Sequence, residues 1–131
     1  MSIRFTIDTS GIEEFLEEIA RLGKDIDQAA AEALKVGGDF LLDGMERRVP
    51  KDTHNLEKHL ERTEPEQDGN YIFVVVGLSK DSDADTARYG MAQEYGTSSM
   101  AAQPYIRPTI DHDMRKARIA MNEKLLELIK K

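Results

Sequence analysis

Cysteine and tryptophan are both absent from the 131-residue sequence. Without cysteine the chain has no disulfide framework, no thiolate metal site and no thiol nucleophile. No stretch approaches the roughly 20 apolar residues that a membrane-spanning helix needs. Asp8 also interrupts the N-terminal segment, which a signal peptide would keep apolar. We therefore expect a soluble protein that is made in the cytoplasm and does not enter a membrane.

Positive charge is scarce, because 18 Lys and Arg residues stand against 25 Asp and Glu residues and the formal net charge is −7. A surface of this sign repels a phosphate backbone, so we do not expect nucleic acid as the main ligand. The length suits a single domain whose core needs neither disulfides nor metal, and neither a linker nor an internal repeat divides residues 1–131.

The spacing of apolar residues predicts one strand followed by helices. Ile3, Phe5 and Ile7 alternate with polar residues, which is the period of a strand with one buried face. Apolar residues then recur at helical spacing from about residue 10 to 22 and from 25 to 48. The second of these helices should end before Pro50, because a proline disfavours helical geometry in the residue that precedes it.

Two glycines, Gly37 and Gly38, lie in the middle of the helix expected at 25–48. Each costs about 1 kcal/mol relative to alanine inside a helix. Either another element packs close to the backbone there, or the helix bends at this point.

The second half of the chain predicts a hairpin, a loop and a long helix. Strand candidates at about 58–67 and 71–78 flank Asp-Gly-Asn, a turn sequence. The second candidate, YIFVVVGL, is apolar on both faces and should be a central strand. The acidic stretch KDSDADTARYG, residues 80–90, indicates a mobile surface loop. From 105 to 131 one apolar stripe predicts an amphipathic helix; it comprises Ile106, Ile110, Met114, Ala117, Met121, Leu125 and Leu128.

The sequence contains one possible metal-binding segment, but its residues do not match the pattern that a calcium site requires. Asp81, Asp83 and Asp85 have the alternate spacing of a calcium loop, but Thr86 replaces the glycine and Ala92 replaces the glutamate that such a loop requires. A solvated acidic loop is the better interpretation. No catalytic or cofactor-binding constellation stands out, and we expect neither an enzyme nor a bound cofactor.

The three histidines also lack ligand spacing. His54 and His59 are five residues apart without the carboxylate arrangement of helical zinc proteases, and we interpret them as surface residues. His112 lies between Asp111 and Asp113 near the start of the last helix, where acids are favoured by the helix dipole alone.

Three short segments carry more information than any catalytic pattern: VPKDTHNL at 49–56, Tyr89 with EYGT at 94–97, and AQPYIRP at 102–108. In this order, around an apolar hairpin, they resemble the small tail components of siphophages, the tail-completion or head–tail joining family. The resemblance covers about residues 11–128. It is carried by Pro50, Asp52, Thr53, Leu56, Tyr89, Glu94, Gly96, Thr97, Pro104, Tyr105, Arg107 and Pro108.

One departure from the family pattern falls in the first segment. The family usually has glycine after the Asp and Thr, where this chain has His54, so the turn there is built differently. Physically, Asp52 or Thr53 can cap local backbone N–H groups once Pro50 has fixed the direction in which the chain leaves the helix.

The third segment has its own physical interpretation. Pro104 prepares the start of a helix, and Tyr105 can bury its ring while its hydroxyl stays in water. Arg107 offers a fork that suits a carboxylate, with Glu94 as the candidate partner. Turn and cap residues that hold the fold are one interpretation of all three segments, and contact with another subunit is the other.

The resemblance implies an α+β fold, with an antiparallel sheet of about three to four strands and long helices packed on one face. It also implies a structural virion protein of a tailed phage or prophage, located in the tail or neck, which assembles as a homo-oligomeric ring and contacts tail-tube and connector proteins. Two features fit assembly: the second apolar face of 71–78, and the polar arm TSSMAAQ at 97–103. The alternative is a small prophage-encoded module that binds a host protein through its acidic surface, and a metal-dependent hydrolase is a third possibility.

Overall fold

The computed structural model describes residues 2–8, 17, 21, 26–50, 55–69, 71–99 and 101–130. The helix expected at about 10–22 lies outside this set except for Glu17 and Arg21, which are helical. The described elements follow in the order β1 (Ser2–Asp8), α2 (Ile26–Arg48), α3 (Asn55–His59), β2 (Leu60–Arg62), β3 (Glu66–Asp68), β4 (Tyr71–Leu78), α4 (Ala84–Tyr95) and α5 (Arg107–Lys130).

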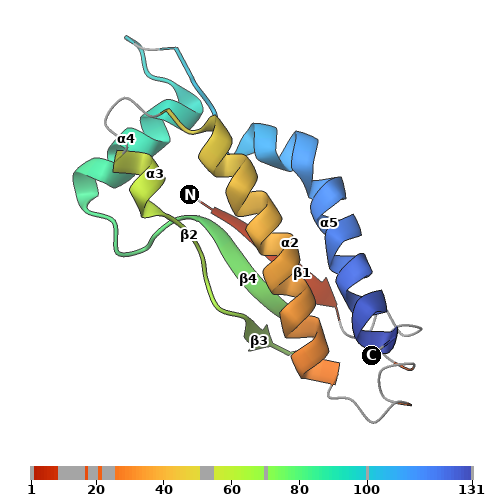
Figure 1. Ribbon diagram of the computed structural model, residues 1–131. Helices are drawn as coiled ribbons and strands as arrows, with labels where there is room; N and C mark the ends of the chain where they lie inside the picture. The colour runs from red at the N-terminus through yellow and green to blue at the C-terminus, as the bar shows by residue number, and fades with distance from the viewer. Residues whose placement is uncertain are drawn as a thin grey trace.

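The sheet is built around β4, which pairs with every other strand in antiparallel fashion (Figure 1). Along one edge, β1 runs beside it from the pair Ser2 and Gly77 to the pair Asp8 and Tyr71. Along the other edge, β2 pairs with the end of β4 and β3 with its start. The central position expected for YIFVVVGL is confirmed, as is the α+β fold with a four-stranded antiparallel sheet.

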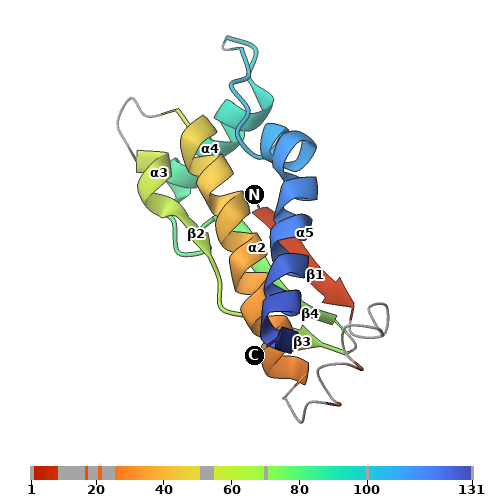
Figure 2. The ribbon, with the colours of Figure 1, turned by 45° about the vertical axis from the view of Figure 1, so that its right-hand side comes forward.

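The two long helices, α2 and α5, lie side by side on one face of this sheet (Figures 1 and 2). The short helices α3 and α4 lie together near the end of β4 (Figure 1). The core fills the space between the long helices and the sheet, because the alternating apolar residues of β1 and β4 meet the apolar stripes of the helices. Its fully buried side chains include Phe5, Leu34, Leu41, Met45, Val74, Val76 and Leu125.

Close packing accounts for the two glycines in the middle of α2. A Cβ built on Gly37 would lie 2.3 Å from Cε1 of Phe5, and one built on Gly38 would lie 2.9 Å from Cγ2 of Val74. Both distances are shorter than real Cβ contacts, so the sheet approaches the helix backbone where no side chain fits. Of the two explanations that the sequence left open, close approach is correct.

The first arm of the hairpin differs from the expected continuous strand at 58–67. Its start is the end of α3, and the strand is split into β2 and β3 by Thr63–Pro65. Pro65 cannot donate to the ladder, which explains the break. Thr63 bridges the gap, since its N–H donates to the oxygen of Val75 at 2.9 Å and its hydroxyl accepts from the N–H of Val75 at 2.9 Å.

Two further expectations were wrong. The segment at 80–90 is not a loop throughout, because α4 begins at Ala84 and includes the rest of the segment. Ile110 was assigned to the buried stripe of the last helix, but its side chain is 40% exposed. It lies in the first turn of α5, which begins two residues later than expected and extends beyond the sheet. In the described part of the chain, no helix is long and apolar enough to cross a membrane.

Candidate functional site

The segments singled out by the sequence meet at one end of the molecule, where α2 ends, α3 and α4 pack together and α5 begins (Figure 1). Pro50 follows the last turn of α2, and the side chain of Leu56 is buried. A Cβ on Gly90, in α4, would lie 3.3 Å from Cδ2 of Leu56 and 3.1 Å from the hydroxyl oxygen of Tyr105. Gly90 therefore lets α4 contact both neighbouring segments closely.

Glu94 provides the main polar connection of this end. Its side chain is 1% exposed, and its carboxylate accepts hydrogen bonds from three consecutive backbone N–H groups. Oε2 accepts from Tyr105 at 2.7 Å, and Oε1 accepts from Ile106 at 3.2 Å and from Arg107 at 2.7 Å. These donors stand at the start of α5, where N–H groups lack helical partners and the helix dipole favours negative charge. Glu94 thus caps α5 from a different helix.

Arg107 completes the connection, as the sequence suggested. Its Nε lies 3.8 Å from Oε1 of Glu94, and its guanidinium also donates to the backbone oxygen of Glu94. The same guanidinium stands 5.2 Å above the ring centre of Tyr95, within the range of a cation–π contact. The Arg107 side chain remains about half exposed, so only the carboxylate of this ion pair is buried.

Tyr105 differs from its expected placement. The whole residue is 0% exposed, and its hydroxyl, expected to reach water, is buried without a hydrogen-bond partner. Burial, together with the negative charge of Glu94, raises the pKa of Tyr105 to about 12. Its backbone oxygen is satisfied by the hydroxyl of Thr109 at 2.7 Å. Tyr105 is therefore a core residue and not an amphipathic surface anchor.

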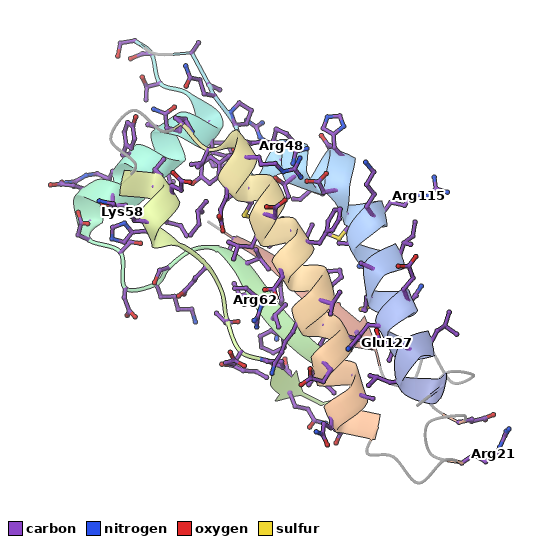
Figure 3. All side chains as sticks on the ribbon, viewed as in Figure 1. Arg21, Arg48, Lys58, Arg62, Arg115 and Glu127 are labelled. Atoms are coloured by element: carbon purple, nitrogen blue, oxygen red, sulfur yellow. The ribbon has the colours of Figure 1, made fainter. Side chains whose placement is uncertain are left out.

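A second ion pair, which the sequence did not indicate, ties α2 to α5 and is partly buried. Arg48 donates through NH1 to Oδ2 of Asp113 at 2.5 Å and to the hydroxyl of Thr109 at 3.1 Å (Figure 3). The hydrogen bond and the positive charge of Arg48 lower the pKa of Asp113. A Cβ on Gly44 would lie 2.1 Å from Oδ2 of Asp113, so only glycine leaves room for the carboxylate. The partners are 65 residues apart, and no local spacing in the sequence connects them.

Four of the remaining signature residues lie in or beside the loop between α4 and α5. Gly96 ends α4 with a φ of 78°, and its N–H donates to the oxygen of Ala92 at 2.8 Å. Thr97 follows with an exposed side chain, and Tyr89 packs partly buried against the core. Pro104 is partly buried before the helix, and Pro108 occupies the first turn of α5. Asp52 and Thr53 lie outside the described residues.

The loop itself extends away from the body of the molecule (Figure 1). Side chains at 97–99 and 101–103 are exposed, and their residues are small or uncharged. At the base of the loop, the N–H of Gln103 donates to the backbone oxygen of Gln93 at 2.7 Å. The signature residues thus hold the fold at this end and present the loop as a candidate contact surface.

The acidic stretch before α4 is used for capping. Asp83 accepts from the N–H of Thr86 at 3.0 Å and from its hydroxyl at 2.6 Å, which lowers the pKa of Asp83. Asp85 pairs with Arg88, one turn along the helix. In the described ranges, no group of three His, Asp or Glu side chains is placed to hold a metal ion.

Comparison with known proteins gives one result. A family described as "Bacteriophage HK97-gp10, putative tail-component" matches residues 13–96, which is more than half of the chain. No curated protein and no solved structure matches it.

Proposed function

We propose that this chain, which belongs to the HK97-gp10-like family of bacteriophage tail components, completes the tail and joins it to the head by assembling as an oligomer. The observation that carries the proposal is the family match over residues 13–96. In this role the protein is made in the cytoplasm of the bacterial host and becomes part of the tail or neck of the virion. Its partners are further copies of itself, the tail tube and the connector.

The contacts at the end of the molecule where the signature segments meet, which we call the motif end, support a structural role without catalytic turnover. The carboxylate of Glu94 is occupied by the backbone N–H groups that begin α5, and that of Asp113 by Arg48. These two carboxylates therefore fix the positions of α2, α4 and α5 relative to one another. They keep the end that carries the 97–103 loop in one geometry, which a contact by surface complementarity requires.

The test is deletion of the gene from the phage or prophage that encodes it, followed by electron microscopy of the lysate. We expect filled heads and separate tails, with few joined particles and little infectivity. A plasmid copy of the gene should restore joined particles, which controls for effects on neighbouring genes. Joined, infectious particles at the normal titre in the deletion strain would reject the proposal. Normal particles with an altered host response would instead favour the host-binding module.

A further inference from the structure

The face of the sheet that α2 and α5 leave open combines an apolar centre with an acidic margin. Tyr71, Phe73 and Val75 alternate with buried residues of β4 and therefore share this face. The Tyr71 side chain is 49% exposed, while Phe73 and Val75 are partly buried. Within the described ranges, no helix packs over these three residues.

The register of the strands places the charges around this centre. Glu66 pairs with Phe73 and Asp68 with Tyr71, so both carboxylates lie on the open face. Glu61 pairs with Gly77 and also lies there. Two described bases also lie there: Arg4, which stands 3.7 Å above the Phe73 ring and 3.3 Å from Asp68, and Lys80, which lines a hollow together with Glu61. The open face is therefore apolar in its middle and negative in sum.

Two hollows lie on the same face, at opposite ends of β4. One has a volume of about 350 Å³ and is lined in part by Glu61, Thr63 and Gly77. The other has a volume of about 310 Å³ and lies between Arg4, Thr6, Asp68 and Tyr71. The face is thus uneven enough to receive projecting side chains along the length of the central strand.

The outer side of α5 has the complementary character. Arg115, Ile119, Asn122 and Leu126 follow at intervals of four, three and four residues, so they form one stripe along the helix. Ile119 is 49% exposed and Leu126 is 43% exposed. The segment at 115–122, RKARIAMN, contains three basic residues and no acidic one. Arg115 points away from the body of the molecule (Figure 3).

We propose that the α5 stripe of one copy docks on the open sheet face of the next copy. The charges are complementary in sum, since residues 115–126 hold four bases and one acid, Glu123, whereas the open face holds three acids and two bases. The stripe is short enough for the face: eight strand residues span about 27 Å, and the twelve residues from Arg115 to Leu126 span about 18 Å. This inference rests on the proposed function, because it names the surface through which the oligomer forms.

The symmetry of such a contact follows from where its two halves lie. On one copy, α5 lies on one side of the sheet (Figure 2), with Ile119 and Leu126 of the stripe exposed to solvent, while the open face is on the opposite side of the sheet. One copy therefore uses two different surfaces toward two neighbours. A head-to-tail contact of this kind closes into a ring when its rotation allows, whereas a two-fold contact would stop at a dimer.

The absence of cysteine makes a crosslinking test direct, since any introduced thiol is the only one in the chain. The phage genome would encode Tyr71→Cys, a host plasmid would supply a size-tagged chain with Ile119→Cys, and particles would be treated with a short bis-maleimide. We expect a crosslinked product that contains one chain of each kind. Arg115→Glu in the tagged chain should lower its yield at least about tenfold, while Lys58→Glu, the same charge change on α3 (Figure 3), should leave it unchanged.

Each other result overturns the inference. Products made of two Tyr71→Cys chains would show a two-fold contact. In a separate variant that carries both cysteines, a crosslink within one chain would show that the chain covers its own sheet face. Particles that contain the protein but give no mixed product would reject this interface and leave head–tail joining intact. Joined particles that lack the protein would instead reject the proposed function itself.

Discussion

Removal of the Glu94 carboxylate should destabilise the protein more than any surface change on α5. In Glu94→Ala the N–H groups of Tyr105, Ile106 and Arg107 lose their acceptor, and those of Tyr105 and Ile106 are buried away from water. A lost cap costs about 1 kcal/mol, and each hydrogen bond to a charged group contributes about 1.5–3 kcal/mol. Because the three bonds share one carboxylate and Arg107 stays near water, we expect a total loss of about 3–4 kcal/mol.

The conservative variant adds a second measurement. Glu94→Gln keeps one carbonyl oxygen as an acceptor but turns an NH2 group toward backbone donors, so we expect a loss of about 1–2 kcal/mol. For a domain of this size, the alanine variant should lower Tm by about 10 °C. Urea and thermal unfolding followed by far-UV circular dichroism would measure both effects.

The matched control is Glu123→Ala, which removes an exposed glutamate from the same helix that Glu94 caps. A change of at most about 0.5 kcal/mol is expected there. If Glu94→Ala were no less stable than Glu123→Ala, the carboxylate would not be holding the start of α5, and this account of the motif end would be wrong.

Three further perturbations test the packing and the pH dependence. Gly37→Ala should lower the free energy of unfolding in urea by about 1–3 kcal/mol, since its Cβ would overlap the Phe5 ring. Combining it with Phe5→Leu should reduce this loss. A more stable Gly37→Ala protein, as the helical preference for alanine alone would give, would contradict the reasoning. Tyr105→Phe removes a buried hydroxyl without a partner, so stability should stay equal or rise by up to about 1 kcal/mol; a clear loss would reveal an unseen partner. Because the pKa of Tyr105 is raised to about 12, wild type should also lose stability above its unfolded value of about pH 10, and Tyr105→Phe should lose less. The pKa of Asp113 is lowered in the folded state, so its pairing with Arg48 stabilises the fold above the unfolded pKa of about 3.9. This stabilisation is lost as the pH falls through the lower folded pKa. Asp113→Asn should therefore be less stable at neutral pH, and its stability should depend less on pH below about pH 4.

Local periodicity predicted those elements whose buried stripe is apolar. β1, α2, β4 and α5 appear close to their expected limits, because each buries one regular set of hydrophobic side chains. Two helices were missed: α3, where a loop and the start of a strand were expected, and α4, where the expectation was a loop. Its buried residues include Thr86, Gly90 and Gln93, at helical spacing but without hydrophobic side chains. A search for apolar stripes cannot find such a helix, although Asp83 provided a capping signal at its start.

The sequence by itself determined the fold class and the family. The alternation in β1, the hairpin signal before β4 and the two helical stripes indicated a mixture of strands and helices. The order of the three signature segments indicated a phage tail component, and that resemblance implied the antiparallel sheet with helices on one face. Only the tertiary structure decided what the signature residues do. Glu94 reaches the start of α5 from another helix, and Arg48 meets Asp113 across 65 residues. Such pairings depend on how the helices pack in space, so they leave no mark in the spacing of residues along the chain.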